Sequence, residues 1–161
     1  MRAVVTRVRS ASVTIRGTVS GEIGQGYLVL LGVGPGDREA TADALADKIC
    51  NMRVFEDENE KMNRSLEQVG GSLLVVSQFT LYADTSSRRP GFSGAARPEL
   101  AEPLYERFMS RCRERGFTVA HGAFGADMLV SSVNDGPVTI VFDTDGNWQP
   151  RPAAGERKHT L

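Results

Sequence analysis

The stretch YLVLLGVGPGDREATADALADKICNM (residues 27–52) passes from a continuous apolar run, through Gly-Pro-Gly, into apolar residues at helical spacing. The run 27–34 predicts a strand buried on both faces, because no polar residue alternates along it. Apolar residues then recur every three or four positions, which predicts a helix over 38–52 with Asp37 as a candidate cap. A buried strand followed by an amphipathic helix indicates a sheet covered by helices.

The chain on either side of this stretch supplies more strands and a second helix. The alternation from Val4 to Ile15 predicts a strand with a bulge near Ser10-Ala11, and 17–26 has the composition of turns and a brief strand. A second amphipathic helix ends at Gly116 and begins at Pro98 or at Pro103, since either proline suits a first helical position. The other predicted elements are a short strand followed by loop at 54–71, and strands at 72–84, 117–121, 127–133 and 138–143.

This order of elements predicts an α+β fold, a compact single domain over 1–143 with a mixed or antiparallel sheet and two main helices. Residues 144–161 have no periodicity and many breakers, so we expect a loosely ordered C-terminal extension.

Bulk composition limits the classes of function. The 161 residues are 40% hydrophobic and 24% charged with a net charge of −1, so the chain has no broad positive field for gripping nucleic acid. Cys50 and Cys112 lie far apart in helix-like stretches and predict buried free thiols rather than a disulfide framework or a zinc site. The N-terminus lacks the apolar core of a signal peptide, and no apolar run approaches the ~20 residues of a membrane span. We therefore expect a cytoplasmic protein without a membrane partner.

The common catalytic and cofactor motifs are missing from the sequence. Only His121 and His159 are histidines, and no HExxH, CxxC, GxSxG, Walker or flanked GxGxxG pattern occurs. The glycines of GVGPGD (32–37) lack the Lys-Ser/Thr ending of a phosphate loop, and Asp37 would repel an anion there. We expect a plain strand–turn–helix junction at this place, and neither a metal nor a cofactor.

Two stretches are unusual for a structural role. In SQFTL (77–81), Ser77, Gln78 and Thr80 interrupt an apolar run, and such polar groups need partners from the protein, from water or from a ligand. In NDGPVT (134–139), Pro137 follows a turn glycine at a position where the strand of a hairpin needs a backbone N–H, which proline does not have. From the residues alone, the plain readings are favoured: a strand leaving the core for the first stretch, and a trans proline at the start of a strand for the second.

Taken together, SQFTL and NDGPVT resemble the two signature motifs of the D-aminoacyl-tRNA deacylase family. The resemblance extends to MRAVVTRVRSASV at the start, to GYLVLLGV, RRPGF and ELAEPLYERF, and to GADMLVSSVNDGPVT, and so covers the chain to about residue 143. It implies a barrel-like sheet and a homodimer with active sites at the subunit interface. It also implies hydrolysis of the ester that joins a D-amino acid to the 3′ end of tRNA.

The resemblance also assigns residues to that reaction. Ser77, Gln78, Phe79 and Thr80 would hold the 3′-adenosine and the ester, with N–H groups near Phe79 and Thr80 stabilising the oxyanion. Gly136-Pro137 would be a cis dipeptide reaching into the partner's site to reject L side chains, a gate that admits glycine and thus glycyl-tRNA mischarged on tRNA-Ala. Substrate-binding roles would also fall to Asn134 and to the methionine of the Met128-Leu129 pair. The terminal 2′-hydroxyl of the RNA would assist, with Thr80 positioning rather than attacking.

Three arginines have an expected role and a plain alternative. Arg88 and Arg89, in a breaker-rich loop, would contact tRNA, or would be solvated surface residues. Arg7 would support the Gly-Pro loop, or would be an exposed strand residue. Ser86-Ser87 depart from the Lys-Gly pair of many family members. Two other functions remain open: a sister editing deacylase acting on mischarged L-threonyl-tRNA, and a non-catalytic RNA-binding module.

Overall fold

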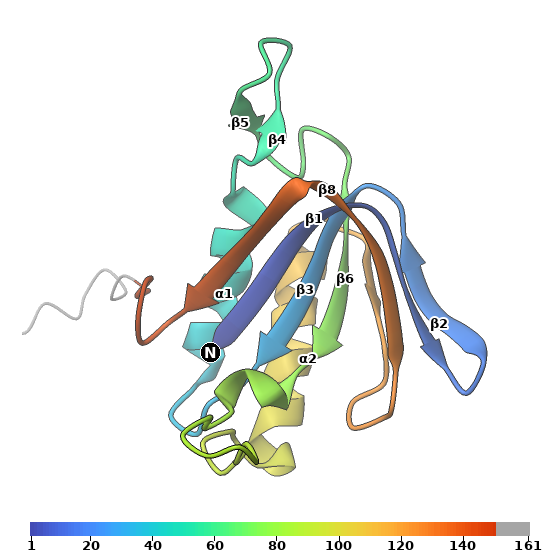
Figure 1. Cartoon of the computed structure of the whole chain (residues 1–161). Coiled ribbons are helices and arrows are strands. Elements are labelled where there is room, and N and C mark those ends of the chain that lie inside the picture. The colour runs from blue at the N-terminus through green and yellow to red at the C-terminus, as the bar shows by residue number, and fades with distance from the viewer. Residues whose placement is uncertain (151–161) are drawn as a thin grey trace, which may run out of the picture.

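The computed structural model describes residues 1–150, which form one mixed sheet with two helices. Figure 1 shows both helices on the same face of the sheet. The elements in chain order are β1 (Arg2–Ile15), β2 (Thr18–Ile23), β3 (Gly26–Gly32), α1 (Glu39–Asn51), β4 (Phe55–Glu56), β5 (Met62–Arg64), β6 (Ser72–Ser77), the 3₁₀ helix η1 (Phe79–Tyr82), α2 (Pro98–Glu114), β7 (Val119–His121) and β8 (Leu129–Asp143).

Two strand–helix–strand units build the centre of the sheet. Strand β6 pairs parallel with both β3 and β7, and α1 and α2 are the crossovers between these strands. The strand β3 is buried along nearly all its length, as its apolar run predicts. Because the three strands are parallel, their carboxyl ends meet at one edge of the sheet, and this edge receives the SQFTL segment.

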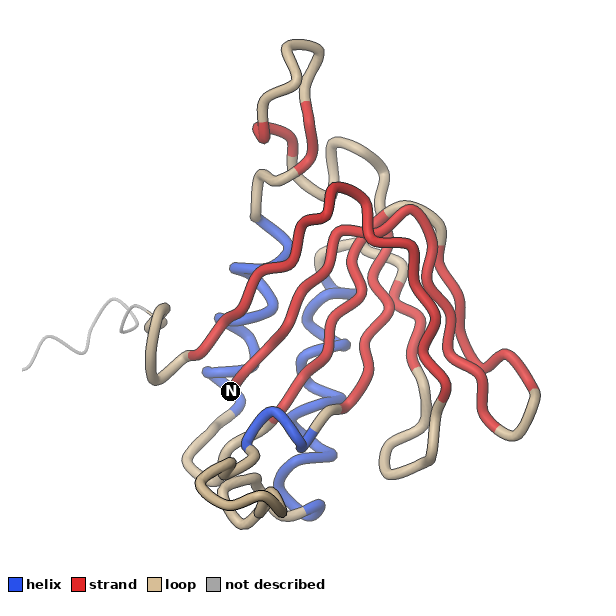
Figure 2. Tube along the Cα trace, viewed as in Figure 1, coloured by secondary structure: helices blue, strands red, loops and turns tan. Residues whose placement is uncertain are grey.

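The long strand β1 joins the rest of the sheet together. It pairs antiparallel with β3 through its first half, with β2 through its second half, and with β8 along both. The register against β8 shifts on either side of Val8, close to the bulge expected near Ser10-Ala11. Both strands bend sharply there, so the sheet folds over into two arms (Figure 2).

The second arm nearly closes into a barrel, which confirms the barrel-like, mixed-sheet prediction. The Ser20 hydroxyl on β2 donates to the carbonyl of His121 on β7, and a Cβ on Gly21 would lie 2.7 Å from that same oxygen. A glycine at position 21 therefore allows the two edges to approach. A small apolar cluster fills this arm, centred on Val8, Val13, Leu28 and Leu74. The larger core lies between the sheet and the helices.

The predicted helices are confirmed and their ends are defined. Helix α1 covers 39–51 with Arg38 at its N-cap, so Asp37 does not cap it; the Asp37 carboxylate accepts the Gly34 N–H instead. Helix α2 begins with Pro98 at its first turn, and Pro103 lies inside it. Gly116 follows the end of α2 with φ of +92°, a conformation that favours glycine. Cys50 and Cys112 are buried free thiols, as predicted.

Two predicted strand boundaries are wrong. The strand expected over 72–84 ends at Ser77, because the Gln78 N–H bonds to Leu31 and β3 ends one residue later, which leaves the chain without a ladder partner. The strands expected at 127–133 and 138–143 are two halves of one strand, β8, and both halves pair with β1. The turn chemistry of 134–137 therefore produces a bend within a strand, not a hairpin.

Residues 144–150 belong to the expected C-terminal extension. Thr144 is buried and accepts a hydrogen bond of 2.6 Å from the Met1 amino group, and Trp148 packs against Phe142 with ring centroids 6.5 Å apart. The rest of the extension, with His159, lies outside the described residues. The domain boundary at 143 stays a prediction.

Candidate active site

The SQFTL segment leaves the sheet at the carboxyl end of β6, between the ends of β3 and β7. Ser77 is the last residue of β6, Gln78 is the N-cap of η1, and Phe79 and Thr80 form its first turn. Ser77 and Gln78 are half-buried, whereas Phe79 and Thr80 are exposed. Ligands of open sheets bind outside the carboxyl ends of parallel strands, so the fold presents these four residues at a place suited to binding.

Two backbone donors in this turn are free. The Gln78 N–H donates to the Leu31 carbonyl at 2.8 Å, and the Leu81 N–H donates to the Gln78 carbonyl at 3.2 Å. Among residues 1–150, neither the Phe79 N–H nor the Thr80 N–H donates a hydrogen bond. Adjacent free N–H groups at the start of a helical turn are suited to an oxygen that carries negative charge.

The Thr80 hydroxyl is held by a donor rather than by a base. The side-chain amide of Gln78 donates to Thr80 Oγ1. A nucleophilic hydroxyl needs an acceptor that takes its proton, and an amide N–H cannot do so. The contact therefore orients the hydroxyl without activating it.

The position of η1 is set by contacts that sequence reasoning missed. Arg2 Nη1 on β1 donates to the Leu81 carbonyl at 2.9 Å, and its guanidinium lies 4.5 Å from the centre of the Tyr82 ring. On the other side, a Cβ on Gly32 would lie 3.0 Å from the Gln78 carbonyl and 3.2 Å from the Cβ of Leu81. No local signal reveals these contacts, because β1 and η1 are almost 80 residues apart in the chain.

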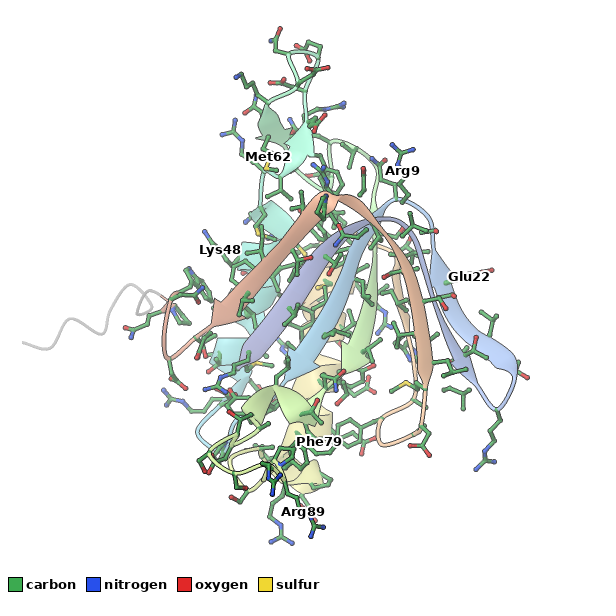
Figure 3. All side chains as sticks on the ribbon, viewed as in Figure 1. Arg9, Glu22, Lys48, Met62, Phe79 and Arg89 are labelled. Carbon is green, nitrogen blue, oxygen red and sulfur yellow. The ribbon has the colours of Figure 1, made fainter. Side chains whose placement is uncertain are left out.

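Arg88 and Arg89 lie in the exposed loop that follows η1. Asp84 and Gly91 exchange two backbone hydrogen bonds, at 2.7 and 2.9 Å, and so close the loop at its base. Within the described part of the chain, neither arginine makes an ion pair. Figure 3 shows Arg89 at the same end of the molecule as Phe79. The loop thus brings positive charge next to the SQFTL segment, although Ser86-Ser87 add none.

The NDGPVT segment forms the bend of β8. The Gly136-Pro137 peptide is cis, as the resemblance implies, and Gly136 has φ of +146°. The Asn134 side chain bridges the bend, since its Oδ1 accepts the Val138 N–H at 2.9 Å and its Nδ2 donates to Thr139 Oγ1 at 3.1 Å. Asn134 therefore supports the shape of the bend from within.

Arg7 lies directly against this bend and is only 5% exposed. Its Nε donates to the Asp135 carbonyl at 2.8 Å and its Nη1 to the Val54 carbonyl at 2.6 Å. A Cβ on Gly136 would lie 3.3 Å from Arg7 Nη2. The expected contact of Arg7 with the Gly-Pro loop is present, and the alternative of an exposed strand arginine is wrong.

Within one chain the two motifs lie far apart. Arg2 contacts η1 and Arg7 contacts the Gly-Pro bend, and both arginines lie on the same extended half of β1. Five residues of strand span roughly 16 Å. Figure 3 agrees, with Arg9 beside the bend at one end of the sheet and Phe79 at the other. The structure therefore does not bring Gly136-Pro137 to Ser77–Thr80 of the same chain.

Met128 and Leu129 precede the bend at the start of β8. Met128 is half-buried against the small apolar cluster, and a Cβ on Gly122 would overlap its sulfur. Leu129 is 73% exposed. A substrate-binding role for the methionine stays a prediction.

Comparison with known proteins identifies the family. The model of the family described as D-Tyr-tRNA(Tyr) deacylase matches residues 4–143. The chain belongs to this D-aminoacyl-tRNA deacylase family. It is 58% identical over 146 residues to a D-aminoacyl-tRNA deacylase of Symbiobacterium thermophilum, which covers 90% of this chain and 97% of the relative. The identity to the D-aminoacyl-tRNA deacylase of Clostridioides difficile strain 630 is 57% over 149 residues, 92% of this chain and all of the relative.

Two solved structures are similar to the fold of this D-aminoacyl-tRNA deacylase family member. A c-Myc DNA Unwinding Element Binding Protein is 41% identical, with a TM-score of 0.84 over 89% of this chain and 98% of that one. A probable eukaryotic D-amino acid tRNA deacylase shares the fold at 17% identity, with a TM-score of 0.75 over 88% and 97% of the two chains. The predicted family is thereby confirmed, and with it the enzyme class, an ester hydrolase.

Two further observations bear on partners and cofactors. In the described part of the chain, no group of three or more histidine, cysteine or acidic side chains is arranged to hold a metal ion. Among residues 1–150, no helix is long and apolar enough to cross a membrane.

Proposed function

We propose that this chain hydrolyses the ester of D-aminoacyl-tRNA and releases a free D-amino acid and tRNA. The observation that carries the proposal is the identity of 56 to 58% to named D-aminoacyl-tRNA deacylases over about nine-tenths of the chain, both motifs included. Identity at this level supports the same fold and the same reaction for this chain.

The backbone N–H donors of η1 stabilise the negative charge that develops when the ester is hydrolysed. The tetrahedral intermediate carries its charge on one oxygen, and the free N–H groups of Phe79 and Thr80 are positioned side by side to receive it. Ser77 and Gln78 line the approach to the same turn. Charge stabilisation by rigid main chain does not depend on an ionisable side chain.

The nucleophile is a water assisted by the terminal 2′-hydroxyl of the RNA. Among residues 1–150, the Thr80 hydroxyl accepts a hydrogen bond from the Gln78 side-chain amide and from no other group, and it bonds to no base, which suits a positioning role. His121 lies on β7, where its Nδ1 faces the neighbouring carbonyl of Gly122. The 2′-hydroxyl lies next to the ester on the same ribose and is therefore already oriented. The substrate itself thus supplies the group that assists the attacking water.

The Gly136-Pro137 bend acts on the site of a second copy of the chain. The separation of roughly 16 Å along β1 prevents it from reaching η1 of its own chain. Arg7, which donates to the Asp135 carbonyl, and Asn134, whose Oδ1 accepts the Val138 N–H, keep the bend in shape. The Gly136 and Pro137 carbonyls then form a rigid wall that accepts the substrate amino group and leaves no room for an L side chain. Glycine has no side chain to exclude, so glycyl-tRNA mischarged on tRNA-Ala is a second substrate.

The contact with tRNA is confined to its acceptor end. The net charge of −1 gives the chain no broad positive field, whereas Arg88 and Arg89 lie beside η1 and make no ion pair in the described structure. A few phosphate contacts suffice for an enzyme that reads one end of its RNA, and predict a shallow salt dependence. We expect the protein to work in the cytoplasm.

The test compares D-tyrosyl-tRNA with L-tyrosyl-tRNA. Rapid release of D-tyrosine with the L ester intact supports the proposal, and glycyl-tRNA-Ala is expected to be hydrolysed as well. L-threonine mischarged on a tRNA for another amino acid is the fourth substrate; its preferred hydrolysis would assign the chain to the sister editing function.

A second candidate is a nucleic-acid-binding module without turnover. It is favoured by the likeness to the c-Myc DNA Unwinding Element Binding Protein at 41% identity. Protection of both tyrosyl esters without release, together with tight binding of single-stranded DNA in the same buffer, would support this function and oppose the deacylase.

A further inference from the structure

Phe79 and Phe92 form an exposed aromatic pair at the site. They are the aromatic members among the exposed large apolar side chains of residues 1–150, with 56% and 38% of their surface in solvent. Their ring centroids are 5.2 Å apart and their planes are nearly perpendicular, at 78°. Two large apolar side chains left in water and packed on each other indicate a binding surface.

The ring of Phe92 has no part in either apolar core. It belongs to neither cluster of buried residues nor to the side chains packed against them. Its backbone is placed by hydrogen bonds instead: Gly91 is bridged to Asp84, and the Phe92 carbonyl accepts the Ala95 N–H at 3.1 Å. The loop thus holds the Phe92 ring against Phe79 without using it to stabilise the fold.

The surroundings of the pair define what it binds. Arg88 and Arg89 belong to the loop that the Asp84–Gly91 bridge closes just before Phe92, and the free N–H groups of Phe79 and Thr80 belong to the turn that carries the Phe79 ring. Aromatic faces next to unpaired arginines are the surface that stacks a nucleobase and holds its phosphate. A nucleotide carrying an ester on its ribose would engage the rings, the arginines and the N–H groups together.

We propose that Phe92 is a positioning residue of the deacylase site: its edge contact fixes the Phe79 ring, so that the terminal base of tRNA stacks there and the ester meets the N–H groups of η1. This inference rests on the proposed function, because it names the residue that seats the substrate of that same site. Phe92 itself does no chemistry. Its loss raises KM for the aminoacyl-tRNA and leaves kcat nearly unchanged.

The test compares Phe92→Ala, Phe92→Leu and Phe92→Tyr with the wild type and with Met62→Ala, an exposed apolar side chain on the β4–β5 hairpin, at the other end of the molecule (Figure 3). Because stacking on one aromatic ring is worth about 1–3 kcal/mol, Phe92→Ala and Phe92→Leu are expected to raise KM roughly 5- to 150-fold. Phe92→Tyr and Met62→Ala are expected to stay within about twofold of the wild type. Circular dichroism checks that each variant is folded, and the Leu variant replaces the Ala variant if the latter unfolds.

A second measurement separates this inference from the proposed function. Binding of adenosine 5′-monophosphate, followed by calorimetry, is expected to weaken by the same factor as KM in Phe92→Ala, whether or not the wild type hydrolyses an ester. If the wild type deacylates D-tyrosyl-tRNA while folded Phe92→Ala and Phe92→Leu keep KM and nucleotide affinity, the inference is wrong and the function stands. A fall in kcat with KM unchanged would also overturn it. If the wild type fails to deacylate, the function fails, and nucleotide binding alone decides the role of Phe92.

Discussion

Thr80 is the residue whose role divides the two mechanisms for this site. Its hydroxyl accepts a hydrogen bond from the Gln78 amide, and no base among residues 1–150 is hydrogen-bonded to it. Thr80→Val keeps the shape of the side chain and removes the hydroxyl, so we expect a loss of roughly tenfold in kcat, the value of one hydrogen bond. Single-turnover hydrolysis of D-tyrosyl-tRNA measures it. A loss of a thousandfold or more, with folding and tRNA binding intact, would identify Thr80 as the nucleophile.

Gly136 is the residue on which the shape of the gate depends. At φ of +146° its added Cβ would lie 2.7 Å from the Val138 nitrogen and 3.3 Å from Arg7. Gly136→Ala is therefore expected to lower stability by about 1–3 kcal/mol and to move the carbonyls that reject L substrates. We expect the ratio of D-tyrosyl-tRNA to L-tyrosyl-tRNA hydrolysis to fall at least about tenfold, since that factor corresponds to only ~1.4 kcal/mol.

Gly70→Ala is the matched control for this change. Gly70 also has a positive φ, of +65°, but a Cβ there would meet nothing within 4 Å. Gly70→Ala also places an alanine at a positive φ, but it does not alter the Gly136-Pro137 bend. An unchanged D-to-L ratio in Gly136→Ala, or an equal change in both variants, would contradict the role of the bend.

At the scale of elements, the two helices are joined by a ladder of ion pairs. Arg107 binds both carboxylate oxygens of Asp43, at 2.7 and 2.9 Å, and Arg111 binds both oxygens of Asp47, at 2.9 and 3.1 Å. Burial raises the pKa of Asp47, but the hydrogen bonds and charges of Arg111 and Arg115 outweigh it, so its pKa lies below the usual range.

The lowered pKa of Asp47 predicts a dependence of stability on pH. A carboxyl whose pKa is lower in the folded state stabilises the fold above its unfolded value of about 3.9, and this contribution is lost as pH falls through the folded pKa. Because Asp47 is partly exposed, we expect Asp47→Asn to cost about 1 kcal/mol at pH 7 and almost nothing near pH 2. Urea unfolding at both values measures it, with the exposed Asp127→Asn as control; an equal cost at both values would contradict the ion-pair origin.

At the scale of the whole molecule, the proposed gate needs a second copy of the chain, because the two motifs lie far apart within one chain. Strand β8 pairs only with β1 among the described elements, and it carries exposed apolar side chains that include Val133 and Val141. An exposed edge with apolar residues suits association with another chain. We therefore propose that a homodimer uses this strand and places each bend at the η1 of the other copy.

Charge substitutions on β8 test this arrangement. Val133→Asp and Val141→Asp are expected to shift the mass measured by light scattering from two chains to one and to abolish deacylation at the same protein concentration. Val19→Asp on β2, equally exposed, is expected to change neither. A wild type that is active as a single chain would contradict the shared site.

The local pattern of the chain was sufficient for the two helices and for the buried strand β3. Helical spacing predicted α1 within one residue at each end, Gly116 marked the end of α2, and the apolar run of 27–34 predicted a doubly buried β3. Polar interruptions and an unusual proline drew attention to Ser77–Thr80 and Gly136-Pro137, but their roles rest on the family resemblance and stay predictions. Periodicity, turn chemistry and motif identity depend on neighbours in the sequence, so they are readable without the fold.

Only the tertiary structure decided how these pieces meet. β8 is one strand because the long β1 offers a partner to both its halves, and β6 stops at Ser77 because β3 ends beside it. The tertiary structure also decided the contact of Arg2 with η1, the contact of Phe92 with Phe79 and the distance between the two motifs. Each depends on segments that are separated in the sequence. Strand pairing is a contact between distant segments, and its outcome depends on which partner the whole sheet leaves available.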